Sequence, residues 1–459
     1  MILFFKQQSS VTIIGAGIAG CVSALYLSKH YQHINIYEAR PDPRQSSLYD
    51  GRSINLTIAK RGLSVLQDLY LTESVLANAI PLEGRIIHYL DETTAYQAYG
   101  NKKHHILYSI SRNKLVQILL NYVEEDANIS VYFNCELYSI DFNYPVLSLF
   151  DKYHKIKFSV YGDIVIGCDG SSSVLRELMY RNNIVDYTKE YLEHNYKELI
   201  LSTVSTEFSS AEPNSNSLHV WPRNNFMMNG FPNLDSTYSC LLFAPFNNSF
   251  FSELDSEEKI SDFLMENFPD LSYHVSSLAS QYSNSKNGTL STVRCSPWHL
   301  DGKIILIGDA AHAIVPFHGQ GMNCALEDCS CLEKMLIKHN YDTESAFRDF
   351  FELRKRESDS IAELSLNNYN ELKKSLLSKD FLQRKELEKQ LTANFPSRYV
   401  PSFHMVCFED TPYSTAYQYS HIQKFILDEL CKESYSLNNI DSHKVSRIVY
   451  SCLPKKHSC

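Results

Sequence analysis

The segment Leu306–Asn323, LIGDAAHAIVPFHGQGMN, holds residues whose types could support several kinds of chemistry. An apolar run typical of a buried strand leads into Asp309, His312 and His318. A zinc or non-haem iron site needs three or more ligands, and these two histidines have no third ligand at useful spacing. We therefore predict no metal site here, a buried structural role for His312, and no catalytic residue in this segment.

A glycine-rich turn near the N-terminus has the spacing of a dinucleotide-binding motif. Gly15, Gly17 and Gly20 follow an apolar, strand-like run at 11–14 and open an expected helix at 17–29. In this pattern the first glycine permits a tight turn, the second lets the backbone approach a pyrophosphate, and the third lets helix and strand pack closely. The phosphate would bind at the helix N-terminus, where free N–H groups and the helix dipole favour an anion.

An acidic residue at the next strand end extends this interpretation. Glu38 ends an expected strand at 34–37, where it can accept both hydroxyls of an adenosine ribose. Its charge would repel a 2′-phosphate, which favours FAD or NAD over NADP as the tightly held nucleotide. Asp169, with Gly170, ends another apolar run, as Asp309 does, and ligands bind at such carboxyl ends of parallel strands.

The two later motifs favour a flavin over a nicotinamide. Asp309 could accept the hydroxyls of a ribityl chain. The Gly319-Gln-Gly321 turn starts a helix whose N–H groups would face an isoalloxazine ring, where their partial positive charge stabilises a reduced flavin. A plain dinucleotide dehydrogenase would need neither motif.

The elements that must position these residues are of two kinds, strand–helix–strand segments and a run of antiparallel strands between them. The further expected elements are helices at 61–70 and 112–124, hairpin-like strands within 86–106, strands at 163–166, 217–221, 226–230, 238–243 and 303–307, and helices after 321. This order predicts an α/β fold with a discontinuous, Rossmann-like FAD-binding domain, an inserted antiparallel β-sheet substrate domain and a C-terminal helical region. The predicted boundaries are 1–73, 105–180 and 290–345 for the FAD-binding domain, 74–104 and 181–289 for the substrate domain, and 346–459 for the helical region.

Composition narrows the class of protein. The 459 residues carry 43 Lys and Arg against 53 Asp and Glu, and no basic cluster offers a nucleic-acid surface. The 12 cysteines contain no Cys-x-x-Cys pair, which indicates reduced thiols in a cytoplasmic protein. No run approaches the roughly 18–20 apolar residues of a membrane span, and the N-terminus lacks a signal-peptide pattern. We expect a soluble protein, and the composition leaves its oligomeric state open, a homodimer included.

Together, the three motifs resemble the aromatic-ring hydroxylases, a family of flavoprotein monooxygenases that use FAD, NAD(P)H and oxygen. The resemblance covers 11 to about 345. Further stretches are similar to the kynurenine 3-monooxygenase branch of that family, namely 37–40, 51–56, 109–112, 218–224, 226–228, 308–328, 364–365 and 368–369. The tail resembles the bacterial type without a membrane-anchoring helix, although the last 40 or so residues match no pattern.

This resemblance implies a set of site residues. The cofactor-binding set is Gly15, Gly17, Gly20, Glu38, Arg40, Arg112, Asp169, Gly170, Asp309, Gly319, Gly321, Met322 and Asn323. The residues expected at the substrate are Arg85, Tyr99, Asn368 and Tyr413 for the carboxylate and amine of L-kynurenine, Phe243 as a ring wall, and His318 facing flavin or substrate. Leu372 stands where the branch has methionine, a nearly volume-conserving change that we expect to keep the pocket.

The resemblance also implies a reaction. NADPH would reduce FAD, oxygen would form a C4a-hydroperoxyflavin, and one oxygen atom would pass to the ring carbon ortho to the substrate amine. That amine already supplies electron density, so no enzymic base is expected. NADPH would bind transiently because the chain has no second GxGxxG motif. Two alternatives remain at this stage, a hydroxylase of another aromatic acid such as salicylate or hydroxybenzoate, and a non-catalytic flavin-binding protein.

Overall fold

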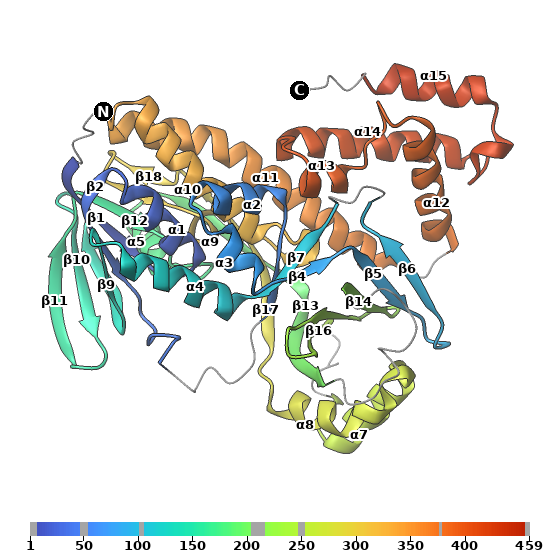
Figure 1. The fold of residues 1–459 in the computed structure, drawn as a ribbon, viewed down its shortest axis with the longest axis horizontal. Coiled ribbons are helices and arrows are strands. Elements are labelled where there is room, and N and C mark those ends of the chain that lie inside the picture. Colours follow the sequence, from blue (N-terminus) through green and yellow to red (C-terminus); the bar gives the residue numbers. More distant parts are fainter. Residues whose placement is uncertain are drawn as a thin grey trace.

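The protein is described here by a computed structural model (Figure 1). The structure describes residues 7–45, 54–100, 105–202, 216–246, 253–375 and 379–454, with the backbone alone at 7, 8, 372–375 and 379. Residues 51–53 of the expected motif at 51–56, the side chain of Leu372, and the last five residues of the chain lie outside the described part.

A six-stranded sheet forms the centre of the nucleotide-binding part. It comprises β1 (Gln7–Ile14), β2 (Tyr31–Tyr37), β8 (Ile129–Tyr132), β12 (Ile164–Gly167), β18 (His299–Leu300) and β19 (Ile304–Leu306). The order is β18-β19-β12-β1-β2-β8, and every pair is parallel except β18–β19. Parallel strands are buried on both faces, which explains their short, continuous apolar runs. The strands expected at 11–14, 34–37, 163–166 and 303–307 are confirmed.

Helices cover this sheet, and some helices that are far apart in the sequence pack against each other. They are α1 (Ile18–Leu27), α2 (Lys60–Asp68), α3 (Thr72–Leu76), α4 (Arg112–Glu125), α5 (Val174–Arg181), α9 (Asp309–His312) and α10 (Gly321–Lys338). The helix α1 packs on both α4 and α10, so the first glycine motif and the last motif share one layer (Figure 1). The expected helices at 17–29, 61–70 and 112–124 are confirmed as α1, α2 and α4.

A seven-stranded sheet forms the second part. It comprises β17 (Gly288–Ser296), β13 (Asp186–Ser202), β16 (Thr237–Pro245), β15 (Met227–Pro232), β14 (Ser217–Pro222), β5 (Gly84–His88) and β6 (Thr94–Ala98), in that spatial order. Its pairs are antiparallel except β14–β5, which is parallel, because β5 enters from a distant segment. The strand β17 pairs with β13 here, although its residues 290–296 were expected with the FAD-binding domain.

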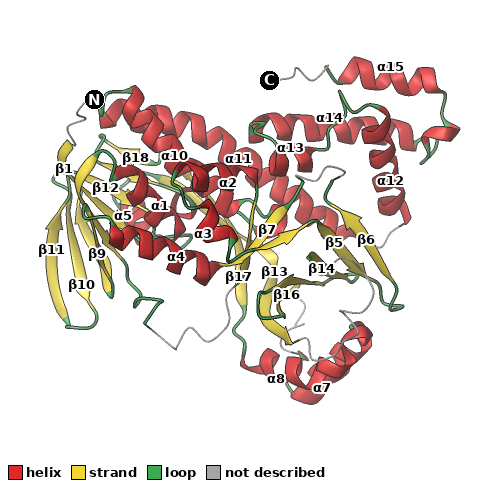
Figure 2. Ribbon diagram, viewed as in Figure 1, coloured by secondary structure: helices red, strands yellow, loops and turns green. Residues whose placement is uncertain are grey.

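Several elements were not expected from the sequence. The helices α7 (Glu257–Asn267) and α8 (Val275–Asn284), with the 3-10 helix η1 (Pro269–His274), cover one face of the seven-stranded sheet (Figure 2). Two three-stranded sheets also form, one from β9 (Cys135–Asp141), β10 (Val146–Asp151) and β11 (Ile156–Tyr161), the other from β3 (Asn55–Ile58), β7 (Leu107–Ser111) and β4 (Ile80–Leu82). The segment 253–285 does carry a helical signal that was overlooked, because Ile260, Phe263 and Leu264, and then Val275, Leu278 and Ala279, have the i, i+3, i+4 spacing of a helix.

The C-terminal part is helical, as expected. It comprises α11 (Thr343–Ser375), α12 (Lys379–Asn394), α13 (Ser402–Phe408), α14 (Tyr413–Cys431), the 3-10 helix η3 (Leu437–Asn439) and α15 (Ser442–Cys452). The helix α11 packs against α10 at one end of the molecule and against α14 towards the other (Figure 1). No described helix combines the length and the apolar character that crossing a membrane would need.

A buried carboxylate fixes the strand end after β19. Asp328 of α10 is 0% exposed, and its Oδ2 accepts a hydrogen bond from Gly308 N at 3.1 Å and lies 2.5 Å from His312 Nε2. Its Oδ1 accepts one from Arg354 Nε at 2.7 Å. Burial raises the pKa of Asp328, but the facing His312 and Arg354 more than offset this and hold it below its usual value. His312 is therefore a buried structural residue, as predicted.

The same cluster brings a thiol close to these groups. The ligand atoms of His312, Cys324 and Asp328 lie within 4.8 Å of one another, a spacing that a metal ion could use. However, Arg354 supplies the positive charge, since it contacts Asp328 and also approaches Cys324 Sγ at 3.3 Å. Burial raises the pKa of Cys324 well above its usual value, which disfavours the thiolate that metals bind.

Replacing Asp328 by asparagine should strongly destabilise the fold, because His312 and Arg354 would lose a buried anionic partner. We expect the free energy of unfolding, measured by urea titration at pH 7, to fall by about 3–5 kcal/mol. Since the folded-state pKa of Asp328 is lowered, this stabilisation is present above its unfolded-state pKa of about 3.9 and is lost as the pH falls through the folded value. The difference in the free energy of unfolding between the variant and the parent should therefore shrink only in strong acid.

The matched control is Asp349→Asn. Asp349 also pairs with a histidine, His339, and a cation, Lys338, but this cluster lies near the surface. Solvent screens such a pair, so its loss should cost below about 1 kcal/mol. Equal losses in the two variants would contradict the importance of the buried network.

Candidate cofactor and substrate site

The glycine-rich turn has the geometry that a bound pyrophosphate requires. Gly15 has a φ of +102°, and a Cβ there would lie 2.6 Å from the carbonyl oxygen of Cys168. A Cβ on Gly20 would lie 1.9 Å from the carbonyl oxygen of Gly15, so helix and turn are in direct backbone contact. A Cβ on Gly17 would meet no atom within 4 Å. The turn is therefore closed underneath and open above Gly17, at the start of α1.

Glu38 is held as a buried anion beside this turn. Its Oε2 accepts a hydrogen bond from Ala16 N at 2.9 Å, and its Oε1 accepts from Arg40 N at 3.0 Å and Arg40 Nε at 2.8 Å. Burial raises the pKa of Glu38, but these bonds and the charge of Arg40 together hold it below its usual value. A carboxylate has about four acceptor positions, so it keeps capacity for a ribose hydroxyl.

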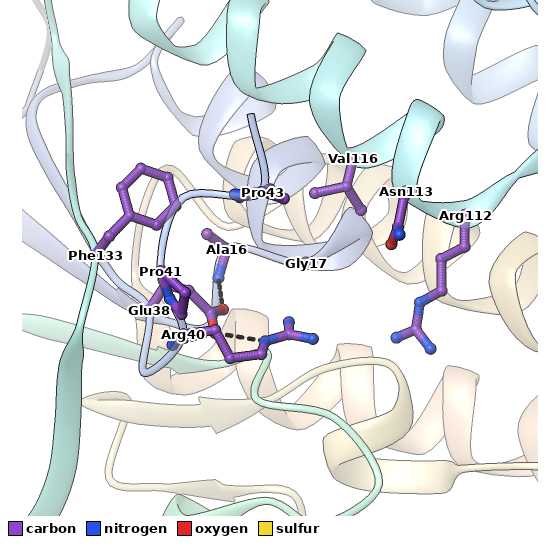
Figure 3. Close-up of a pocket in the computed structure, with 10 residues that line it drawn as sticks. All are labelled: Ala16, Gly17, Glu38, Arg40, Pro41, Pro43, Arg112, Asn113, Val116 and Phe133. Carbon is purple, nitrogen blue, oxygen red and sulfur yellow. Dashed lines mark hydrogen bonds and ion pairs between the residues drawn. The ribbon is translucent and has the colours of Figure 1, made fainter. Parts of the chain in front are cut away.

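An open pocket surrounds these groups. It is lined by Ala16, Gly17, Glu38, Arg40, Pro41, Pro43, Arg112, Asn113, Val116 and Phe133 (Figure 3). The guanidinium groups of Arg40 and Arg112 point into the same space below Gly17 in Figure 3. The first turn of α1 carries no acidic residue, so its N–H groups add to this positive field. The pocket therefore suits an anionic ligand.

Two further acidic side chains lie at the same sheet edge. Asp169 accepts a hydrogen bond from Leu175 N through Oδ2 at 3.0 Å, while its Oδ1 is buried and meets no donor among the described residues. Burial raises the pKa of Asp169. The carboxylate of Asp309, at the first residue of α9, accepts no hydrogen bond within the described part of the chain. Buried polar atoms normally have partners, so this edge has unused polar groups for a ligand.

The turn before α10 is fixed from inside the protein. Asn323 is 0% exposed; its Nδ2 donates to the carbonyl oxygens of Thr57 at 2.9 Å and Gly319 at 3.1 Å, and its Oδ1 accepts from Ala59 N at 2.9 Å. The side chain expected at the cofactor is thus used to hold the turn, and Met322 packs against the main core. The helix α10 begins at Gly321 without a side-chain cap or an acidic first turn, which leaves N–H groups for a ligand.

These groups fit FAD. The open Gly17 turn suits a pyrophosphate, Glu38 suits a ribose, and the partnerless Asp169 oxygen and uncapped α10 lie along the edge that continues from them. NAD would use only the Gly17 turn and Glu38, and would leave Asp169 and the start of α10 without a ligand.

Arg85 and Tyr99 lie together at the edge of the seven-stranded sheet. Arg85 Nε donates to Gln97 Oε1 at 3.0 Å, and no described carboxylate forms an ion pair with this half-buried guanidinium. Burial lowers the pKa of Arg85, while Tyr99 opposes that effect. Burial raises the pKa of Tyr99, and the positive charge of Arg85 lowers it in part. A half-buried cation beside a neutral hydroxyl is suited to an anionic ligand.

The other expected substrate residues meet around the 3-10 helix η2 (Pro316–His318). The ring of Phe317 lies 5.4 Å from that of Phe243, and its carbonyl oxygen accepts a hydrogen bond from Asn368 Nδ2 at 3.3 Å. On the other side, the ring of His318 lies 5.6 Å from that of Phe403, which lies 5.8 Å from Tyr99. Phe243, Asn368, His318 and Tyr99 therefore belong to one continuous set of contacts.

His318 is a neutral, partly unsatisfied group in this set. It is 6% exposed, and burial lowers its pKa to about 4. Its Nδ1 has no hydrogen-bond partner among the described residues. The imidazole is therefore uncharged at neutral pH and only weakly basic.

Tyr413 has a different environment. Its side chain is 0% exposed, and its hydroxyl donates to Gln320 Oε1 at 3.1 Å. The guanidinium of Arg61 lies over its ring at 4.0 Å. The hydroxyl that the resemblance assigns to a substrate contact is thus engaged with the turn before α10.

Sequence reasoning missed several residues of the site. Phe317 and Gln320 lie inside the quoted motif, but nothing in their type indicated an aromatic contact or a turn contact. Phe403, Arg61 and Phe133 come from segments with no motif, and only the fold brings them to the site.

Comparisons with known proteins agree with this geometry. Residues 8–346 match a family model described as an FAD binding domain. A kynurenine 3-monooxygenase of Legionella pneumophila (strain Corby) is 34% identical over 440 residues, 96% of this chain and 97% of that protein. A kynurenine 3-monooxygenase of Xanthomonas axonopodis pv. citri (strain 306) is 37% identical over 449 residues, 97% of this chain and 98% of that protein.

A solved structure supports the fold. The tetrameric form of 2-methyl-3-hydroxypyridine-5-carboxylic acid oxygenase superposes with a TM-score of 0.65 at 17% identity, over 82% of this chain and 96% of that chain. The chain belongs to the kynurenine 3-monooxygenase family of FAD-binding proteins.

Proposed function

We propose that this protein is an FAD-dependent monooxygenase that hydroxylates L-kynurenine to 3-hydroxykynurenine. The overall reaction consumes NADPH, a proton and O2, and yields NADP⁺ and water beside the hydroxylated product. The observation in the site that carries the proposal is Arg85, a half-buried cation without a described carboxylate partner, next to Tyr99, which indicates a substrate with a carboxylate. The names of the relatives support the same substrate.

The side chains around η2 fit the two ends of this substrate. The carboxylate would pair with Arg85, since a guanidinium recognises a carboxylate through two parallel hydrogen bonds. The aromatic ring would lie against Phe243 and Phe317, which form an apolar wall. Asn368 would present its amide beside this wall, because it is already oriented by the carbonyl oxygen of Phe317.

The chain's own contribution to the reaction is binding, orientation and exclusion of water. Bound FAD supplies the redox chemistry that delivers one oxygen atom of O2 to the ring. The substrate amine activates the ring carbon beside it, so no described side chain is assigned as a catalytic base. The aromatic wall is apolar and the buried His318 is uncharged at neutral pH, so neither draws water strongly into the site where oxygen transfer would take place.

We also propose that the domains predicted from the sequence have separate roles in binding the cofactor and the substrate. The FAD-binding domain, predicted from the sequence over 1–73, 105–180 and 290–345, holds the cofactor, and the sheet domain, predicted over 74–104 and 181–289, supplies Arg85, Tyr99 and Phe243. We place the start of the third FAD-binding segment after β17, since that strand pairs within the seven-stranded sheet. The helical region, 346–459, supplies Asn368.

The deciding experiment is NADPH oxidation by the purified holoenzyme with L-kynurenine. We expect substrate to stimulate NADPH oxidation and mass spectrometry to show a product heavier by one oxygen atom. Stimulation by salicylate or hydroxybenzoate and not by kynurenine would instead identify a phenolic-acid hydroxylase. FAD binding without substrate-dependent oxygen consumption would identify a non-catalytic flavoprotein.

Replacing Arg85 by alanine should raise the KM for kynurenine by about 10- to 100-fold, because a hydrogen bond to a charged group contributes about 1.5–3 kcal/mol. FAD content should stay that of the parent. Arg85→Lys is the matched control, since it keeps the charge but loses the paired geometry, and we expect an intermediate KM. An unchanged KM in the alanine variant would refute the carboxylate assignment.

Replacing Gly17 by valine should give a folded protein that lacks FAD. The backbone of Gly17 has a φ of −75°, which valine tolerates, and the new side chain would project into the space where nothing lies within 4 Å. It would therefore block the pyrophosphate and leave the fold intact. The measurements are flavin absorbance of the purified protein and thermal unfolding of the apoprotein; normal flavin content would contradict the role of this turn.

A further inference from the structure

Asn229 of β15 lies on the face of the seven-stranded sheet that carries the proposed substrate residues. In the ladder between β14 and β5, Leu218 lies beside Arg85, so their side chains point to the same face. Val220, two residues after Leu218, shares that face and lies opposite Asn229. Asn229 therefore points to the same side of the sheet as Arg85.

The same register places Asn229 between the two ends of the proposed site. Met227, two residues before Asn229 on β15, lies opposite Phe243 of β16, the expected ring wall. Asn229 is therefore one strand away from Phe243 and two strands away from Arg85, in a sheet whose neighbouring strands lie about 4.8 Å apart. A substrate held by Arg85 at one end and by Phe243 at the other would lie over Asn229.

The amide of Asn229 is a polar group in apolar surroundings. Its neighbours on this face, Val220, Leu241 and Met227, are each at most 8% exposed. The Oδ1 atom of Asn229 is buried and has no hydrogen-bond partner among the described residues. An unbonded amide oxygen in apolar surroundings is unfavourable, so this position suits a ligand that supplies a donor.

L-Kynurenine has a donor of the required kind on its ring. One N–H of the ring amine bonds within the molecule to the neighbouring ketone oxygen, and the second N–H points away from that ketone. A carboxamide oxygen has two lone pairs and can accept this second N–H. Such a bond uses the hydrogen and leaves the nitrogen lone pair conjugated with the ring, as oxygen transfer to the adjacent carbon requires.

We propose that Asn229 is a specificity-determining residue whose amide oxygen accepts the second N–H of the ring amine. The inference rests on the proposed function and deepens it, because the other two contacts do not distinguish ring substituents. A guanidinium at Arg85 recognises a carboxylate, and an apolar wall at Phe243 recognises a ring. Asn229 is the contact that selects a ring bearing an amine.

The test compares two ligands on the oxidised holoenzyme without NADPH, so that neither is turned over. L-Kynurenine and 3-benzoyl-L-alanine differ only in the ring amine. In Asn229→Leu we expect the dissociation constant of kynurenine, measured by isothermal titration calorimetry, to rise about 3- to 10-fold, the effect of one neutral hydrogen bond. The dissociation constant of benzoylalanine should stay the same or fall, because this ligand offers the amide no donor.

Equal weakening of both ligands would place the contact on the ketone or the amino-acid part that they share, and would overturn the proposal. An unchanged dissociation constant for kynurenine would overturn it as well. If the parent holoenzyme failed to bind kynurenine at all, the proposed function would fall and this inference with it, so the two failures are distinguishable.

The matched control is Ser217→Ala. Ser217 of β14 is 1% exposed, and its hydroxyl also has no partner among the described residues. It precedes Leu218, so it points to the opposite face of the same sheet. Its loss should leave the dissociation constants of both ligands unchanged. A preference for kynurenine that shrank equally in both variants would show a general effect on the sheet and would overturn the role of Asn229.

A second measurement tests whether the amide is unbonded in the ligand-free holoenzyme. Leucine has the branched shape of asparagine without its polar atoms, so Asn229→Leu should keep or raise the urea midpoint of unfolding. A lower midpoint would show that the amide already has a partner within the protein, and would overturn the proposal.

Discussion

The parallel pairing of β1, β2, β12 and β19 is the constraint on which the rest of the site depends. Parallel neighbours end at the same edge, so this pairing places Gly15, Glu38, Asp169 and Asp309 on one side of the sheet although they span almost 300 residues of sequence. Each residue alone is ordinary. Their chemistry arises because a turn with free N–H groups, an anion for hydroxyls and an unpaired carboxylate oxygen share that edge.

The buried ionic cluster of Asp328, His312 and Arg354 stabilises the strand end at this edge. Asp328 binds Gly308 N directly, so the turn after β19 is fixed by a carboxylate that must remain charged. Burying a carboxylate is unfavourable unless it is paired, and His312 with Arg354 supply the pairing. The histidine that first suggests metal or acid–base chemistry is therefore needed beneath the site, where it supports the backbone that precedes Asp309.

The nucleotide end was predictable from sequence because its signals are local. Gly15, Gly17 and Glu38 follow from strand and helix periodicity within 30 residues, and the structure gives each glycine the environment that was expected. The substrate end depends on long-range packing, so Arg85 alone would pass for a solvated strand residue, and Phe403 carries no signal. The helices α7 and α8 were missed although their signal is local, since the buried residues Val275, Leu278, Ala279 and Tyr282 of α8 recur at helical spacing.

The 3-10 helix η2 joins the proposed substrate residues to the turn that is proposed to face the cofactor. Phe317 packs on Phe243 of the sheet domain, and the next residue, His318, packs on Phe403 of α13. Gly319 follows immediately and begins the turn into α10. The carbonyl oxygen of Gly319 accepts hydrogen bonds from Thr57 and Asn323, so the short segment between Phe317 and the start of α10 is held in one conformation. If these rings contact the substrate as proposed, a ligand that shifts either ring would act on the same three residues that precede α10, and so on the turn proposed to face the cofactor.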